Sequence, residues 1–265
     1  MMNKIVPFKS NYKTIRKIET TAFYFLLSAA VIIGILWLAP KLNLNTSIKS
    51  FLFPFKEFVK SLSYVSMIGY LGLSIIAKIL FKDAEKNKRD DLIDNSFGTS
   101  YSNENSSGYY NNEEMPFGIK KLALNSYESS FHTENTLKRM LYKMSLKVLL
   151  FAIPFSLSIF TSGGENIVRL LFEISIPIIL LLQLITTIVF FNSIKNLNER
   201  FKIELINIGK STLEIKDYSK LLIPVMEYYN IKSWANINLD EKIFEKHNTE
   251  ISEKWLNRKG NLGIE

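Results

Sequence analysis

The chain has 265 residues, a formal net charge of +8, no cysteine, and two histidines, His132 and His247. The lack of cysteine excludes disulfides, thiolate metal sites and cysteine nucleophiles, and two histidines argue against a multi-histidine metal site. We therefore expect no metal and no cofactor.

Four uncharged, apolar stretches predict an integral membrane protein. Roughly 20 residues of helix, at about 1.5 Å each, cross a ~30 Å hydrocarbon core, and a helix satisfies its own backbone groups there. We expect an all-α integral membrane protein with four transmembrane helices arranged as two hairpins, a cytoplasmic middle segment and a helical C-terminal tail. The four stretches are Thr20–Pro40, Ser61–Ala77, Val148–Gly164 and Ile174–Ile194.

These stretches divide the chain into four regions. The turn at Glu165–Arg169 carries one basic residue, whereas the other polar regions carry many, and Lys and Arg favour the cytoplasmic side. We expect a multi-pass protein of the bacterial inner membrane with both termini in the cytoplasm. The regions are 1–81 (cytoplasmic leader and first transmembrane hairpin), 82–147 (cytoplasmic connector and candidate sensing segment), 148–194 (second transmembrane hairpin) and 195–265 (cytoplasmic helical tail).

The middle segment alternates between helical and turn-forming composition. Residues 82–94 are predicted to continue the second span as a helix, and residues 95–116 are rich in Asn, Ser and Gly, which favour turns. Apolar residues at helical spacing predict a short amphipathic helix over 117–132. A separate helix would then lead into the third span, with Asn135 or Thr136 as its cap.

The tail is predicted to be helical as well. Residues 195–209 prolong the fourth span, and Ser211–Glu214 forms a capping-box pattern ahead of a helix that Pro224 is expected to bend or shorten. A last helix, from about residue 240 to 259, is expected to pack through Trp255.

The most site-like stretch lies in the turn-rich part of the middle segment. It combines hydrogen-bonding side chains, aromatic faces for stacking and glycines for close backbone approach. A binding site for a small ligand or partner, a structured connector and a disordered loop all remain open. The candidate contact residues are Asp94, Asn95, Phe97, Tyr109, Tyr110, Asn111 and Asn112.

Polar residues of the fourth span are candidates for lining a pore. Glu173 could attract cations at the outer end, and Gln183, Thr186 and Thr187 lie in mid-span. The alternatives are an interfacial salt-bridged turn for Glu173 and hydrogen bonding between helices for the other three.

The sequence contains none of the common enzyme motifs, such as a P-loop, GxGxxG, HExxH or GxSxG. We therefore assign no catalytic residue and expect a protein that is not an enzyme. The positive charge flanks the apolar stretches, which indicates contact with anionic lipid headgroups and not direct binding of nucleic acid.

The order of these elements resembles the SMODS-associated four-transmembrane effectors. In those proteins an acidic-aromatic motif follows the second span and a basic amphipathic helix precedes the third, which here correspond to Lys88–Thr99 and Pro116–Met140. The resemblance implies a bacterial anti-phage effector of abortive infection that damages the inner membrane. It also implies a trigger, either a cyclic nucleotide or a retron-type partner.

We therefore expect a homo-oligomeric effector that permeabilises or depolarises the inner membrane when its cytoplasmic segments are triggered. Four helices do not easily enclose an ion path, so conduction would need several protomers. The alternative is a non-conducting membrane anchor or assembly protein that recruits a cytoplasmic partner.

Overall fold

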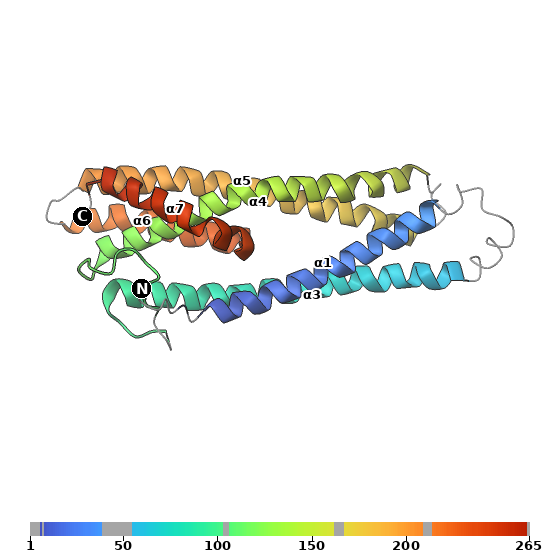
Figure 1. The fold of residues 1–265 in the computed structure, drawn as a ribbon, viewed down its shortest axis with the longest axis horizontal. Coiled ribbons are helices and arrows are strands. Elements are labelled where there is room, and N and C mark those ends of the chain that lie inside the picture. Colours follow the sequence, from blue (N-terminus) through green and yellow to red (C-terminus); the bar gives the residue numbers. More distant parts are fainter. Residues whose placement is uncertain are drawn as a thin grey trace. The chain divides into compact units, whose positions relative to one another are not determined.

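The structure, a computed structural model, is all-helical over the residues that it describes. These are residues 6, 8–38, 55–102, 106–161, 167–208 and 214–263, with side chains described except at 37, 38, 152–161 and 167–176. They contain no β-strand, which confirms the predicted all-α class for this part of the chain. The six helices are α1 (Lys9–Leu38), α3 (Lys56–Phe97), α4 (Ile119–Thr161), α5 (Ile167–Ile208), α6 (Ile215–Ala235) and α7 (Glu241–Asn261) (Figure 1).

Three of the described helices are long and apolar enough to cross a membrane. They are Lys9–Leu36 within α1, the whole of α3, and Pro177–Ile208 within α5. They coincide with the first, second and fourth predicted stretches, which supports the prediction of a membrane protein. Most of the third predicted stretch, from residue 152 onward, lies outside the described side chains.

The chain divides into two compact units that share its long helices. We name them the bundle unit (Met1–Tyr12, Leu80–Tyr142 and Thr186–Glu265) and the apolar unit (Lys13–Ile79 and Lys143–Ile185). Helices α1, α3, α4 and α5 each contribute residues to both units. The middle segment and the tail, which are far apart in the sequence, therefore belong to one unit.

The apolar unit combines a small core with large exposed aliphatic side chains. Its buried residues include Leu26, Met67 and Leu180, and the relative exposures of Ile68 and Ile79 both reach 60%. Such outward-facing aliphatic side chains are typical of a lipid-facing helix surface.

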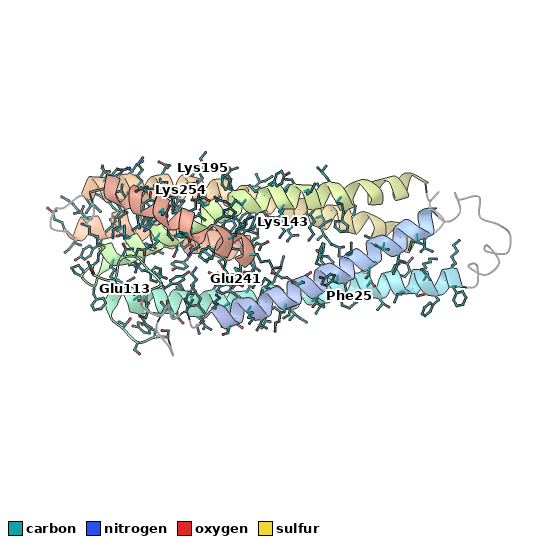
Figure 2. All side chains as sticks on the ribbon, in the orientation of Figure 1. Phe25, Glu113, Lys143, Lys195, Glu241 and Lys254 are labelled. Atoms are coloured by element: carbon teal, nitrogen blue, oxygen red, sulfur yellow. The ribbon has the colours of Figure 1, made fainter. Side chains whose placement is uncertain are left out.

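Small residues bring α1 and α3 together in the apolar unit. The Ser28 hydroxyl lies 3.2 Å from the Ser66 hydroxyl. A Cβ at Gly69 would come within 2.9 Å of the Phe25 ring, which is labelled in Figure 2. Close contacts through small residues are common between membrane helices, where they allow backbones to approach.

The bundle unit has an aromatic core in which the last helix takes part. Trp255 of α7 is fully buried and packs edge-on against Tyr127, with ring centroids 5.0 Å apart, and Tyr127 stacks on Phe201 of α5 at 5.4 Å. The prediction that Trp255 packs the last helix is confirmed. Aromatic pairs of this kind add about 0.5–1.5 kcal/mol beyond the area they bury.

Helix α4 is continuous, so the predicted cap at Asn135 or Thr136 is wrong. The Asn135 amide donates to the Phe131 carbonyl at 2.9 Å, and the Thr136 hydroxyl donates to the His132 carbonyl at 2.8 Å. Side chains that bond back to the preceding turn in this way leave the helix unbroken.

Helix α6 corrects two further expectations. Glu214 is its N-cap residue, and the Asp217 carboxylate accepts from the Glu214 N–H at 3.2 Å, so the capping interaction lies three residues beyond the predicted start. Pro224 is buried inside the helix and does not shorten it. Burial of the flanking residues Leu221 and Val225 offsets the roughly 3 kcal/mol that an interior proline costs.

Candidate functional site

Two buried aspartates at the end of α3 organise the segment that leads to α4. Asp91 accepts hydrogen bonds from the Ser106 N–H (2.5 Å) and hydroxyl (2.8 Å). Asp94 accepts from the N–H groups of Tyr101 (2.8 Å) and Ser102 (2.7 Å) and from the Ser102 hydroxyl (2.6 Å). Burial raises the pKa of Asp91 despite its hydrogen bonds from Ser106. Burial would also raise the pKa of Asp94, but the hydrogen bonds from Ser102 and Tyr101 outweigh it and hold that pKa below its ordinary value. The carboxylates hold the local backbone.

The neighbouring candidates Asn95 and Phe97 differ in their surroundings. The Asn95 amide donates to the Ser106 hydroxyl at 3.0 Å and to the Asp91 carboxylate at 3.2 Å. Phe97, the last residue of α3, is 41% exposed. Asn95 therefore belongs to the connector, whereas Phe97 is accessible to a partner.

Asn111 and Asn112 fasten the far end of the connector to α4. The Glu128 carboxylate accepts from the amides of Asn111 (2.8 Å) and Asn112 (3.0 Å) and from the Asn111 N–H (3.2 Å). The Asn112 amide also donates to the buried Asn125 side chain at 3.0 Å. Because Glu128 and Asn112 are both buried, this network fixes where the connector lies on α4.

Tyr109 and Tyr110 form an aromatic pair beside this network. Their rings meet edge to face with centroids 4.7 Å apart, and Phe8 contacts Tyr109 in the same manner at 5.3 Å. Burial raises the pKa of both tyrosines above its ordinary value, so both phenols remain protonated at neutral pH.

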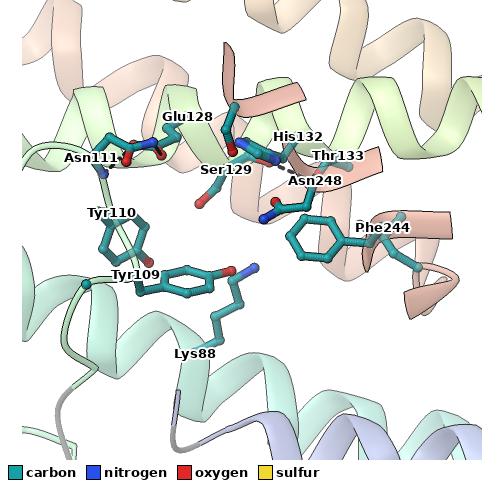
Figure 3. Close-up of a pocket in the computed structure, with 13 residues that line it drawn as sticks. Lys88, Tyr109, Tyr110, Asn111, Glu128, Ser129, His132, Thr133, Phe244 and Asn248 are labelled. Carbon is teal, nitrogen blue, oxygen red and sulfur yellow. Dashed lines mark hydrogen bonds between the residues drawn. The ribbon is translucent and has the colours of Figure 1, made fainter. Parts of the chain in front are cut away.

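A cavity of about 90 Å³ lies where the connector, α3, α4 and α7 meet (Figure 3). Tyr109 and Tyr110 line it from the connector, Lys88 from α3, and Phe244 and Asn248 from α7. Typical sites for small organic molecules measure about 300–1,000 Å³, so this cavity is suited to an ion or a few water molecules.

A buried ion pair lies in the same unit. Lys232 of α6 is 2.5 Å from the Glu85 carboxylate of α3, and the Tyr12 hydroxyl donates to Glu85 at 2.6 Å. Burial alone would lower the pKa of Lys232, but the Glu85 carboxylate outweighs it and holds that pKa above its ordinary value. Lys232 is therefore a permanent cation and compensates Glu85.

The predicted pore-lining residues have different environments. Gln183 is exposed, Thr186 is partly buried and Thr187 is fully buried in the single chain. The Glu173 side chain lies outside the described residues.

Sequence reasoning did not identify several residues of the cavity. Asn248 and Ser252 follow Phe244 at four-residue steps on α7, and Glu128 and Ser129 form a polar pair on a mostly buried stretch of α4. The four-residue spacing was visible in the sequence. It could not be interpreted without knowing that α7 packs on α4.

Comparison with protein-family models, with curated proteins and with solved structures gave no match for this chain.

Proposed function

We propose that the chain is the membrane effector of a bacterial anti-phage system of the abortive-infection type, which permeabilises or depolarises the inner membrane when its bundle unit is triggered. The observation that carries this proposal is the continuity of α3 and α5. Helix α3 has 42 residues and is therefore about 63 Å long, roughly twice the thickness of the hydrocarbon core. One end of the helix is apolar, and the other carries the connector.

This continuity supplies a physical route from trigger to membrane. A ligand or partner that favours one arrangement of the bundle unit would also bias the membrane segments of the same helices, because a helix moves as a stiff element. The exposed aliphatic side chains of the apolar unit suit contact with lipid and with further protomers of a homo-oligomer.

The size of the cavity bears on the nature of the trigger. A volume of about 90 Å³ is smaller than a nucleotide requires, so the described residues favour a protein partner over a cyclic nucleotide. Phe97, 41% exposed at the end of α3, is a natural contact for such a partner.

The proposal predicts loss of membrane potential in cells that overproduce the protein, measured with a potential-sensitive dye. Gln183 is exposed on α5 among aliphatic residues, where a polar side chain can meet another protomer or water. We expect Gln183→Leu to reduce depolarisation at equal membrane abundance, and Leu182→Ile, a change between apolar residues on the same helix, to leave it intact.

Normal potential in cells with abundant, membrane-inserted parent protein would contradict the effector proposal and favour a membrane anchor. An exposed apolar stripe on α6 specifically supports that alternative. Its residues recur at helical spacing and are Ile215 (88% exposed), Tyr218 (47%), Leu222 (41%) and Met226 (57%). A stripe of this kind suits the recruitment of a partner helix.

A further inference from the structure

We propose that the cavity of the bundle unit binds one small oxyanion, such as phosphate, through the ammonium group of Lys88. The inference concerns a binding site in the bundle unit and does not depend on whether the protein permeabilises membranes. It rests on the charge of Lys88, the hydrogen-bond donors around it, and the size of the space that they enclose.

Lys88 lines the cavity beside two aromatic rings. It forms no ion pair or hydrogen bond with the described part of the chain, and its ammonium lies 5.9 Å from the Phe8 ring centroid and 5.7 Å from that of Tyr109. The nearby carboxylate of Glu85 is already paired with Lys232 at 2.5 Å. Burial and the neighbouring Lys232 lower the pKa of Lys88, and the carboxylates of Glu85 and Asp91 offset only part of this effect. An anionic ligand in the cavity would therefore stabilise the charged form of Lys88.

Several other donors line the same cavity without using their hydrogen-bonding capacity. The Tyr110 hydroxyl is buried and has no hydrogen-bond partner among the described residues. The side chains of Ser129, Asn248 and Ser252 also make no hydrogen bond within that part of the chain. Figure 3 shows Lys88, Tyr110, Ser129 and Asn248 around one space. A buried donor such as the Tyr110 hydroxyl normally has a partner, and one oxyanion can accept both from it and from the partly exposed side chains around it.

Glu128 also lines the cavity, and its charge would oppose an anion. Its carboxylate oxygens, however, accept from the amides of Asn111 and Asn112 at 2.8 and 3.0 Å. These bonds direct the negative charge toward the connector (Figure 3). The donors from α3 and α7 therefore define the binding end of the cavity.

The volume restricts the ligand. In this measure of volume one buried water needs about 10–15 Å³, so about 90 Å³ holds several waters or one ion of the size of phosphate. A larger molecule could place only a terminal phosphate here. The shared chemistry is thus a phosphate group, either free or as the end of an ester such as a lipid headgroup.

The test is anion binding to the full-length chain in uncharged detergent, in a buffer of chloride salts. Inorganic phosphate and glycerol phosphate are titrated separately by calorimetry, and thermal unfolding is followed in parallel. We expect saturable binding of one anion per chain and a higher unfolding temperature. Binding of glycerol phosphate alone assigns the source to an ester, and binding of inorganic phosphate assigns it to the free ion.

The matched variants are Lys88→Met and Lys86→Met, because Lys86 is an exposed lysine of the same helix. We expect Lys88→Met to fold, since no ion pair is broken. We also expect it to weaken anion binding at least about tenfold, because one charge-assisted hydrogen bond to the anion is lost. Lys86→Met should bind as the parent does, and Asn248→Ala should bind more weakly than the parent. The proposal is overturned if the parent binds neither anion saturably, or if Lys88→Met binds with the affinity of the parent.

Discussion

Glu85 and Lys232 form an ion pair inside the bundle unit, with side chains that are 18% and 6% exposed. The pair joins α3 to α6, and the Tyr12 hydroxyl extends it to α1. Two charges removed from water at this depth depend on each other, because either one alone would be buried without compensation.

We predict that either Glu85→Gln or Lys232→Met lowers the free energy of unfolding by about 3–5 kcal/mol. This is the usual cost when one charge of a buried pair is removed and the other stays buried without compensation. The double variant should lose less than the sum of the two single variants, measured by denaturant unfolding in detergent. Lys202→Met is the control, because Lys202 and its partner Glu199 are 45% and 56% exposed, and it should change stability by less than about 1 kcal/mol. Additive losses in the double variant would show that the two charges do not interact.

The helices are fastened to one another by polar contacts at their edges as well as by apolar packing. Helix α7 buries only Ile251 and Trp255, and a cluster of charges supplements this narrow contact. Glu250 of α7 accepts two hydrogen bonds from Arg139 of α4, at 2.9 and 3.0 Å. Lys254 and His247 add further contacts on α7 itself.

This cluster predicts an acid-sensitive attachment of α7. Hydrogen bonds from Lys254 and His247, together with the charge of Arg139, lower the pKa of Glu250 from 4.5 to about 2. The folded pKa lies below the unfolded value, so the stabilisation is present above pH 4.5 and is lost as the pH falls toward 2. We expect the unfolding temperature of the parent to fall more steeply than that of Glu250→Gln in this window.

Glu253→Gln is the matched control, because Glu253 is an exposed carboxylate of α7 with no ion pair among the described residues. Its pH profile should follow that of the parent. High salt should narrow the difference between the parent and Glu250→Gln, since the charges are partly exposed. Parallel profiles for the parent and Glu250→Gln would exclude this role for the cluster.

At the scale of the whole molecule, the chain combines a lipid-compatible unit with a unit whose core contains many polar side chains. The bundle unit buries Asn125, Ser130 and Asn198, and Ser130 donates to the Asn198 side chain. Such a core requires its hydrogen bonds to be satisfied internally and a surface in contact with water. We therefore propose that the bundle unit lies in the cytoplasm, as the distribution of Lys and Arg predicts.

Cysteine labelling tests this topology, because the chain contains no native cysteine. Ser107→Cys probes the connector at an exposed position. Gly163→Cys probes the turn that the sequence predicts between the third and fourth spans, at residues outside those that the structure describes. We expect a membrane-impermeant maleimide to label only the Gly163 variant in spheroplasts. The Ser107 variant should be labelled after detergent is added, and its labelling in intact spheroplasts would reverse the orientation.

The elements that were predicted correctly are those for which local sequence is decisive. A run of about 20 apolar residues is costly to expose to water whatever its partners, so α1, α3 and the apolar part of α5 could be identified from composition. The continuations of α3 and α5 beyond the apolar stretches were also predicted, over residues 82–94 and 195–209, and the structure ends these helices at Phe97 and Ile208. The cap expected at Asn135 or Thr136 failed because both side chains bond back to carbonyls of their own helix.

The sequence by itself determined that the chain is helical, belongs in a membrane and has a polar connector containing Tyr109–Asn112, because run length and turn composition are local properties. Only the tertiary structure decided that Glu85 pairs with Lys232 and that Lys88, Tyr110 and Asn248 line one cavity. Each of these groups draws its partners from helices far away in the sequence. Their charges and hydrogen-bond donors interact strongly only when packing brings them together and excludes water around them.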